Sequence, residues 1–285
     1  MKRNLGVGIL AFNRPQYLRR LVASLEMQTD LCDCEFHLFL DGAVNQASGK
    51  RRAEQKDIDA CGRLFERARL PNKHIHRREH NVNIGSASLE ATDMLASNYE
   101  RIMQLEDDLV LSPDWFHLAR ILYEELEEHP DVYSFSPGFR RAGTHADDAA
   151  NLGRIVYAWH HMWCECFTAD RWRRIRDYYM EFHAYIVGED YIERAGDPVR
   201  DFFDGLGMRE DLACSQDGGR EMAIRRSGMC RARCAVNRAL GIGKQGIHFT
   251  PELYANMGFA QQVPFMFKSD AAREGFEWDA TGDAG

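Results

Sequence analysis

The stretch Leu5-Gly-Val-Gly-Ile-Leu-Ala-Phe12, followed by Asn13-Arg14-Pro15, decides the fold class of this chain. An apolar run of this length predicts a buried strand, and Asn-Arg-Pro predicts the turn that ends it. Apolar residues then recur at helical spacing from Tyr17 to Leu25, which predicts a helix. A buried strand, a turn and a helix in this order are typical of the start of a parallel α/β sheet.

The same alternation of strands and helices continues along the chain. Apolar runs predict strands at residues 36–40, 75–77 and 102–105, with a helical pattern between each pair. Further strands are predicted at residues 132–136 and 155–159. A spacing of about 30 residues between strands is typical of a mostly parallel central sheet flanked by helices. We therefore expect an α/β fold with a smaller C-terminal region beside the sheet.

The chain contains no repeat and no low-complexity linker, so we expect one domain built from two halves. The first half comprises residues 1–130, and the second comprises residues 131–258. Residues 259–285 are expected to form a partly flexible extension, because they end in the polar sequence Thr-Gly-Asp-Ala-Gly. Over residues 189–219 the periodicity is too weak to predict an element.

The charge balance argues against nucleic acid as the main partner. Thirty-six Lys and Arg residues face forty-four Asp and Glu residues, which gives a net charge of −8. The N-terminal apolar stretch is short and is interrupted by Gly6 and Gly8, unlike a signal sequence or a membrane-spanning helix. We expect no integral membrane segment and a cytoplasmic location, with peripheral attachment to a membrane left open.

None of the eight cysteines lies in a C-x-x-C motif, and the chain is much longer than a disulfide-stapled secreted domain. We expect reduced thiols that pack as small apolar side chains. A weaker alternative is a metal site formed by His160, His161, Cys164 and Cys166.

Three adjacent acids, Glu106-Asp107-Asp108, directly follow the predicted strand at residues 102–105. Neighbouring carboxylates repel one another and are costly to bury without a cation. Mg²⁺ and Mn²⁺ prefer such oxygen ligands, and they take their remaining ligands from phosphates and water. The alternative is a solvated acidic turn before a helix. Because Asn13-Arg14 and Asp41 also follow predicted strands, all these polar groups are expected at one edge of the sheet, which favours a ligand site.

These strand ends resemble those of GT-A glycosyltransferases, and most of all those of the N-acetylglucosaminyltransferase I family. The resemblance rests on Asn13-Arg14-Pro15, on Asp41, and on Leu105-Glu-Asp-Asp-Leu109 with Ser112-Pro-Asp-Trp-Phe116. A second block resembles the family downstream: Cys230-Arg-Ala-Arg-Cys-Ala-Val-Asn-Arg238 and Gly241-Ile-Gly-Lys-Gln-Gly-Ile-His248. The resemblance spans residues 5–255 and is strong only in these blocks. It departs where the family has Asp-Asp-Trp and this chain has Gln216-Asp217-Gly218, and where Cys-Arg-Pro-Glu becomes Cys-Arg-Ala-Arg.

The resemblance implies a metal-dependent, inverting hexosyl- or N-acetylhexosaminyltransferase. It implies that residues 1–130 bind a nucleotide-diphospho sugar, with a UDP-sugar as the expected donor, and that residues 131–258 carry the acceptor and catalytic side. The expected acceptor is a hydroxyl of a glycan or a small molecule. The expected cofactor is Mn²⁺ or Mg²⁺.

The resemblance also implies roles for individual residues. Asp108 would bind the metal, and Asp217 would be the general base that takes the acceptor's proton. Glu106 and Asp107 would bond the ribose and sugar hydroxyls. The remaining donor-binding residues that we expect are Phe12, Asn13, Arg14 (near the base or phosphates), Asp41 (at the base), Asn83, Lys244 and His248.

Several of these residues have structural alternatives. Asn83 would also suit a helix N-cap, and Asp217 beside two glycines would also suit a turn. Lys244 lies in a glycine-rich loop that would order over a donor or would be an ordinary connection. Three roles are open for His248: a metal ligand, a phosphate contact or a packed histidine. The aromatic segment at residues 157–163 would line a sugar pocket or belong to the core.

Two other functions remain open from the sequence. One is nucleotidyl transfer or phosphoester hydrolysis at the same metal site. The other is a non-catalytic module that binds nucleotide sugars or glycans. The sequence does not specify the donor sugar, the acceptor or the linkage.

Overall fold

A computed structural model describes residues 3–29, 31–138, 145–158, 163–208, 212–247, 249–262 and 276–280 of the chain. Its strands are β1 (Arg3–Ala11), β2 (Cys34–Leu40), β3 (Lys73–Arg77), β4 (Tyr99–Glu106), β5 (Leu109–Leu111), β6 (Val132–Ser136), β7 (Arg154–Ala158), β8 (Cys164–Thr168), β9 (Cys230–Cys234), β10 (Ala239–Gly241) and β11 (Glu277–Asp279). Its helices are α1 (Pro15–Leu25), α2 (Gln55–Arg67), α3 (Ile84–Asn98), α4 (Trp115–Glu125), α5 (His145–Ala150), α6 (Ala169–His183), α7 (Asp197–Gly205), α8 (Gln216–Arg226) and α9 (Pro251–Asn256), with 3₁₀ turns at Leu126–Glu128 and Phe259–Gln261.

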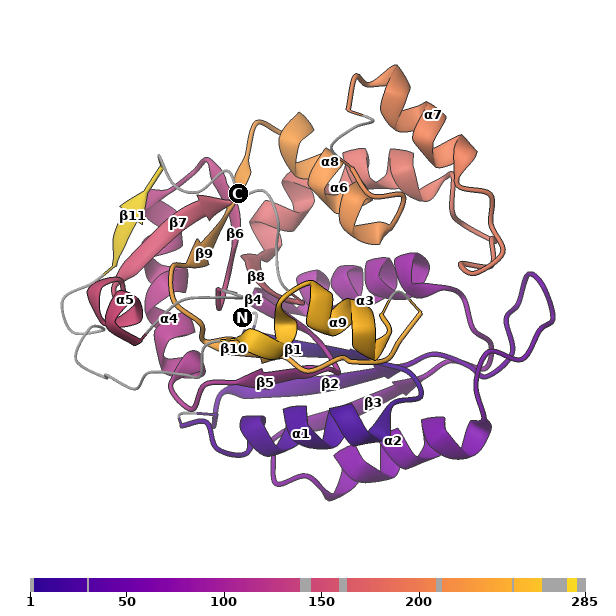
Figure 1. Ribbon diagram of the computed structural model, residues 1–285, viewed down its shortest axis with the longest axis horizontal. Coiled ribbons are helices and arrows are strands. Elements are labelled where there is room, and N and C mark those ends of the chain that lie inside the picture. The colour runs from indigo at the N-terminus through magenta and orange to yellow at the C-terminus, as the bar shows by residue number, and fades with distance from the viewer. Residues whose placement is uncertain are drawn as a thin grey trace.

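Within these described residues, nine strands form one sheet in the order β11-β7-β9-β6-β8-β4-β1-β2-β3. Five of the eight neighbouring pairs are parallel, and the antiparallel ones are β4–β8, β8–β6 and β9–β7. Helices cover both faces of the sheet, with α1 and α2 on one side and α3, α6 and α8 on the other (Figure 1). The predicted α/β fold with a mostly parallel, helix-flanked sheet is confirmed. Strands from both predicted halves share this sheet.

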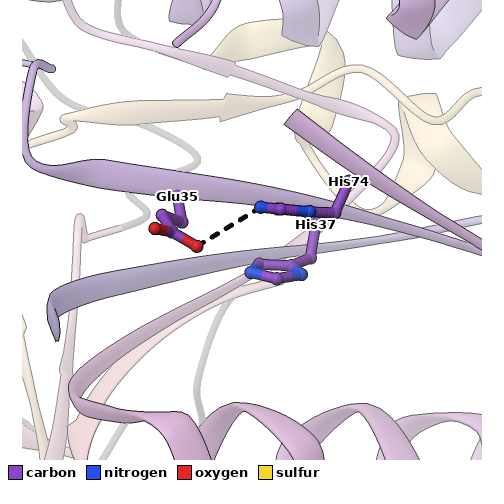
Figure 2. A group of neighbouring side chains, drawn as sticks. All are labelled: Glu35, His37 and His74. Carbon is purple, nitrogen blue, oxygen red and sulfur yellow. Dashed lines mark ion pairs between the residues drawn. The ribbon is translucent and has the colours of Figure 1, made fainter. Parts of the chain in front are cut away.

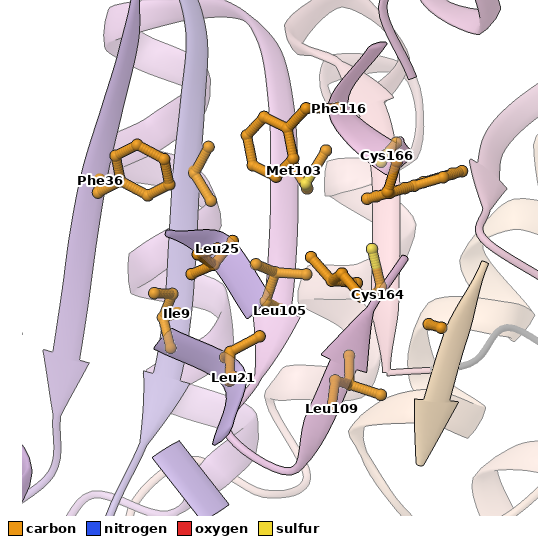
Figure 3. Close-up of a cluster of buried hydrophobic side chains, with 14 of the residues drawn as sticks. Ile9, Leu21, Leu25, Phe36, Met103, Leu105, Leu109, Phe116, Cys164 and Cys166 are labelled. Atoms are coloured by element: carbon orange, nitrogen blue, oxygen red, sulfur yellow. The ribbon is translucent and has the colours of Figure 1, made fainter. Parts of the chain in front are cut away.

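The core on the α1 side is built by the apolar runs that the sequence analysis singled out. Ile9 of β1, Phe36 of β2 and Leu105 of β4 are fully buried beneath α1 (Figure 3). Cys164 and Cys166 of β8 are buried in the same cluster as small apolar side chains. All eight cysteines are free thiols. His160 and His161, named with Cys164 and Cys166 as a weaker metal candidate, lie outside the described residues.

The two glycines of β1 allow close packing on the opposite face. A Cβ atom on Gly6 would collide with the ring of Tyr99, and one on Gly8 would lie 2.6 Å from Cδ1 of Leu95. Tyr99, at the start of β4, therefore passes directly over β1 and reaches β2. The glycines set how closely α3 and Tyr99 approach the centre of the sheet.

A short two-stranded sheet joins two parts of the chain that are far apart in sequence. β10 pairs with β5 in antiparallel register, with Ala239 opposite Leu111 and Gly241 opposite Leu109. The Arg238 guanidinium is almost fully buried and bonds the Asp114 carboxylate at 2.9 Å. The two sequence blocks that carried the family resemblance thus lie side by side.

Several elements after residue 160 are not predicted from the sequence. β8 was not predicted, because Glu165 interrupts its apolar run; Glu165 is buried through ion pairs with Arg220 and Arg231. α7 was not predicted either, because it lies in the stretch of weak periodicity. None of the helices in the described ranges combines the length and apolar character needed to cross a bilayer.

Candidate functional site

The acidic triplet lies at the carboxyl end of the central strand β4. β4 ends at Glu106 and β5 begins at Leu109, so Asp107 and Asp108 form the tight turn between the two strands. β4 is parallel to β1, and Glu106 lies opposite Leu10. The loop that follows β1 is therefore held beside the acids, as is typical of ligand sites in open α/β sheets.

Arg14 occupies this loop and pairs with two of the acids. It is the N-cap residue of α1, and Pro15 is the first residue of that helix. Its Nη1 lies 2.9 Å from Oδ2 of Asp108, and its Nη2 bonds Oδ1 of Asp107. From the sequence, Arg14 is expected near the base or phosphates of a donor, and its ion pair with the acids is not predicted.

The site carries more negative charge than Arg14 neutralises. Asp107 is 1% exposed, and its Oδ2 has no hydrogen-bond partner. Burial raises the pKa of Asp107 to about 6, although Arg14 acts in the opposite direction. Burial also raises the pKa of Glu106 well above its usual range, and the nearby carboxylates of Asp108 and Asp217 raise it further. The site therefore lacks positive charge.

A divalent cation fits this charge deficit. The unpartnered Oδ2 of Asp107 and the partly exposed carboxylate of Asp108 are hard oxygen donors of the kind that Mg²⁺ and Mn²⁺ prefer. Among the described residues, the acids of the triplet do not converge as a set of three close ligand atoms. A metal here would take one or two oxygens from the protein and the rest from phosphates and water.

A pocket lies beside Glu106. It is lined by residues of α3, β4, β8 and α8 and by Trp163, among them Ser88, Gln104, Glu106, Glu165, Gln216, Asp217 and Arg220. The pocket brings Glu106 and Asp217 onto one surface. Of the predicted aromatic segment at residues 157–163, Trp163 lines the pocket, and residues 159–162 lie outside the described ranges.

Asp217 lies in the first turn of α8, where close packing fixes the backbone. A Cβ atom on Gly218 would collide with the carbonyl oxygen of Ala213, and one on Gly219 would collide with the Phe182 ring of α6. The two glycines thus belong to the helix and allow it to pack closely, rather than forming a turn after Asp217. The half-buried Asp217 is held at the pocket by this packing.

The glycine-rich loop after β10 lies against the acidic turn. The backbone N–H of Ile242 donates to the carbonyl oxygen of Asp108 at 2.8 Å. A Cβ atom on Gly243 would collide with the Asp108 carboxylate, and one on Gly246 would lie 3.3 Å from Nη1 of Arg14. Lys244 is exposed, with Nζ 5.6 Å from the centre of the Tyr254 ring. The predicted donor contact His248 lies outside the described residues.

Two predicted donor-binding residues hold loops near the site. The Asp41 carboxylate follows β2 and accepts bonds from the backbone N–H groups of Gly42 and Val82 and from the side chain of Asn81. Asn83 caps α3 by accepting from the Ser86 N–H at 2.9 Å, and its amide donates to carbonyls of the segment after α6. Any contact of these side chains with a donor remains a prediction.

Phe12 and Asn13 complete the loop after β1. Phe12 is partly buried and packs against the core on the α1 side, and Asn13 is half-buried. Their contacts with a donor also remain predictions.

A buried, positively charged side chain at the pocket, that of Arg220, is not predicted from the sequence. Arg220 of α8 is 5% exposed and bonds Glu165 at 2.8 Å and Oε1 of Gln104 at 2.9 Å. Nearby, Oε1 of Gln216 is buried without a hydrogen-bond partner. No motif marks these residues, because a single arginine in a charged helix resembles a surface residue.

No family model matches this chain, and no sequence match was found among curated proteins. Among solved structures, a mannosyltransferase from Pyrobaculum calidifontis in complex with GDP-Man and Mn²⁺ is 13% identical, with 61% of this chain and 47% of that chain covered and a TM-score of 0.43. S. aureus TarS 1–349 is 10% identical, with coverages of 85% and 61% and a TM-score of 0.49. A cytidylyltransferase from Leptospira borgpetersenii is 12% identical, with coverages of 61% and 64% and a TM-score of 0.36.

The chain spans less than two thirds of the length of each of these solved structures. TarS 1–349 has also been solved with UDP-GlcNAc, and there the TM-score is 0.40. Likenesses with TM-scores below 0.5 do not assign this chain to a family.

Proposed function

We propose that this protein is a metal-dependent, inverting glycosyltransferase of the GT-A type that moves a sugar from a nucleotide-diphospho donor to an acceptor hydroxyl. One observation carries the proposal: the pocket that joins Glu106 and Asp217 adjoins the turn formed by Asp107 and Asp108. A metal–diphosphate site, a pocket and a candidate base are then neighbours. We propose a UDP-sugar as the donor, because the resemblance of the sequence to GT-A glycosyltransferases implies one.

In this proposal the three acids of the triplet have different roles. Asp108, together with the unpartnered Oδ2 of Asp107, would hold Mn²⁺ or Mg²⁺. When bound, that cation neutralises charge on the leaving diphosphate. Glu106, whose pKa is raised, would be protonated over a wider pH range and could donate a hydrogen bond to a donor hydroxyl. The Arg14 guanidinium would leave its ion pairs with Asp107 and Asp108 and bind the diphosphate of the donor.

Asp217 would act on the acceptor. As the acceptor oxygen attacks the anomeric carbon, the bond from that carbon to the diphosphate breaks, and the acceptor proton passes to Asp217. The nucleoside diphosphate leaves with the bonding electrons. A single displacement of this kind inverts the anomeric configuration. The domain assignment follows: residues 1–130 bind the donor, and residues 131–258 present the acceptor side.

The test is turnover of a panel of nucleotide sugars with Mn²⁺, measured as release of nucleoside diphosphate. Asp108→Asn is expected to lower kcat/KM on the order of 100-fold or more, because it removes a charge needed as the leaving group departs. Asp217→Asn is expected to lose turnover and keep donor binding. Asp197→Asn, at an exposed ion pair on α7, is the matched control.

Three outcomes would contradict the proposal. Undiminished turnover in Asp108→Asn or in excess chelator would exclude the metal role. Release of pyrophosphate, or of inorganic phosphate from a phosphoester, would indicate nucleotidyl transfer or hydrolysis instead. Binding of UDP with Mn²⁺ and no product from any donor would indicate a non-catalytic module.

A further inference from the structure

A cluster of histidines and one glutamate lies on β2 and β3, apart from the site described above. Glu35 and His37 are two residues apart on β2, so both point to the same face of the sheet. His74 on β3 lies opposite His37 in the parallel register. The rings of His37 and His74 stack with centroids 4.7 Å apart, and Nε2 of His74 lies 3.3 Å from Oε2 of Glu35 (Figure 2).

This cluster is not part of the proposed donor site. Glu35 lies near the start of β2, whereas Asp41 follows the opposite end of the same strand. The acidic turn lies at the carboxyl end of β4, two strands away from β2 in the sheet. The proposed glycosyl transfer therefore makes no use of Glu35, His37 or His74.

The ligand atoms of the three residues lie close enough to share one ion. One atom from each of Glu35, His37 and His74 can be chosen so that all lie within 4.8 Å of one another. Tetrahedral zinc with bonds of about 2.0–2.1 Å needs ligand atoms about 3.4 Å apart. His74 has the freedom to close that difference, because its side chain is 45% exposed and β3 is the edge strand of the sheet.

Neighbouring groups would orient these ligands. Tyr99 Oη donates to Oε2 of Glu35 at 2.7 Å, and Nδ1 of His37 lies 2.9 Å from Nε2 of His76. If His37 binds an ion through Nε2, that nitrogen exchanges its present contact with Tyr99 Oη for the metal, and Nδ1 remains held by His76. Metal-binding histidines and carboxylates usually have such outer partners.

We propose that Glu35, His37 and His74 bind Zn²⁺, with a fourth position open to water on the exposed side of β3. Two imidazoles and one carboxylate are a common zinc ligand set, whereas Mg²⁺ and Mn²⁺ favour oxygen ligands. Glu35 and His37 are 7% and 5% exposed, so the β2 side of the site is rigid and the β3 side is accessible. Bound zinc would tie the edge strand β3 to β2.

The experiment measures zinc binding directly. The protein carries Asp108→Asn, which removes one of the two proposed donor-site metal ligands, and Cys32→Ser, which removes the exposed thiol. It is freed of metal and titrated with Zn²⁺ by calorimetry. Co²⁺ then serves as a spectroscopic probe of the ligands. We expect one equivalent of Zn²⁺ and a tetrahedral Co²⁺ spectrum without thiolate absorption. The Asp108→Asn background makes this result independent of the proposed transferase activity.

His74→Ala is the decisive variant, because this exposed side chain can be removed without opening the core. It is expected to weaken zinc binding on the order of 100-fold and to abolish the rise in melting temperature that Zn²⁺ gives the parent. His80→Ala, another exposed histidine, is the matched control and is expected to bind like the parent. Absence of zinc binding by the parent, or unchanged binding in His74→Ala, would overturn the proposal.

Discussion

At the scale of single residues, the site is dominated by carboxylates in poorly solvated positions. Arg14 compensates part of that charge, and an oxygen of Asp107 is left without a partner. The pairing of Arg14 with Asp107 and Asp108 could not be predicted from the sequence, because it depends on the register that sets Leu10 beside Glu106. The position of the acids was predictable, since acids that directly follow a buried strand must lie at its end.

Asp41 gives a prediction on pH at this scale. Burial raises its pKa to about 6. The folded protein therefore keeps the Asp41 proton up to about pH 6, whereas the unfolded chain releases it near pH 4. Between these values the folded state binds more protons, so the Asp41 contribution to the free energy of unfolding decreases as the pH rises. The loss is about 3 kcal/mol in total and is complete above about pH 7.

The measurement is urea unfolding of the wild type and of Asp41→Asn from pH 4 to pH 7.5. The other carboxylates titrate in both proteins, so the difference between the two curves isolates Asp41. The wild type is expected to lose stability relative to Asp41→Asn as the pH rises. Parallel curves across this range would show that burial does not raise the Asp41 pKa.

At the scale of elements, the strands β1 to β4 followed from the sequence, as did β6 and β7 of the second half, whereas β8 and β9 did not. Strands β1, β2 and β4 are rich in apolar residues because helices bury both faces of the sheet there. β8 carries Glu165 in its centre, and only the folded structure supplies Arg220 and Arg231 to balance that charge. Likewise, the place of Gly219 depends on its contact with the Phe182 ring of α6, which is distant in the sequence.

The glycines of β1 give a prediction on packing. Gly6→Ala is expected to lower the free energy of unfolding by about 2–3 kcal/mol, because its methyl group would meet the rigid Tyr99 ring. Gly8→Ala is expected to lower the free energy of unfolding by less, because its methyl group would meet the movable end of the Leu95 side chain. Gly205→Ala, which would meet nothing within 4 Å, is the control for denaturant unfolding. Equal losses for Gly6→Ala and Gly205→Ala would contradict the packing explanation.

At the scale of the whole molecule, a C-terminal segment of the chain packs against the acidic turn formed by Asp107 and Asp108. β10 pairs with β5, and the loop after β10 covers Asp108. Gly243→Ala is expected to weaken binding of UDP with Mn²⁺ about tenfold or more, because its Cβ would displace the loop or the Asp108 carboxylate. Such a loss corresponds to about 1.4 kcal/mol.

The rise in melting temperature with UDP and Mn²⁺ measures this effect. Gly205→Ala is the control, because its Cβ would meet nothing within 4 Å and Gly205 lies on α7, outside the loop. Without ligand, all three proteins are expected to melt within a few degrees of one another. Wild-type ligand affinity in Gly243→Ala would show that the loop does not need to lie against Asp108.

The pairing of β5 with β10 also has a consequence for biosynthesis. The ribosome makes the acidic turn well before the residues that cover it, because β10 lies far after β5 in the sequence. A nascent chain that ends before residue 239 would contain every acid of the triplet and lack the neighbouring strand. If the protein has the proposed function, nucleotide binding is therefore expected only after residues 239–241 have been made and have paired with β5.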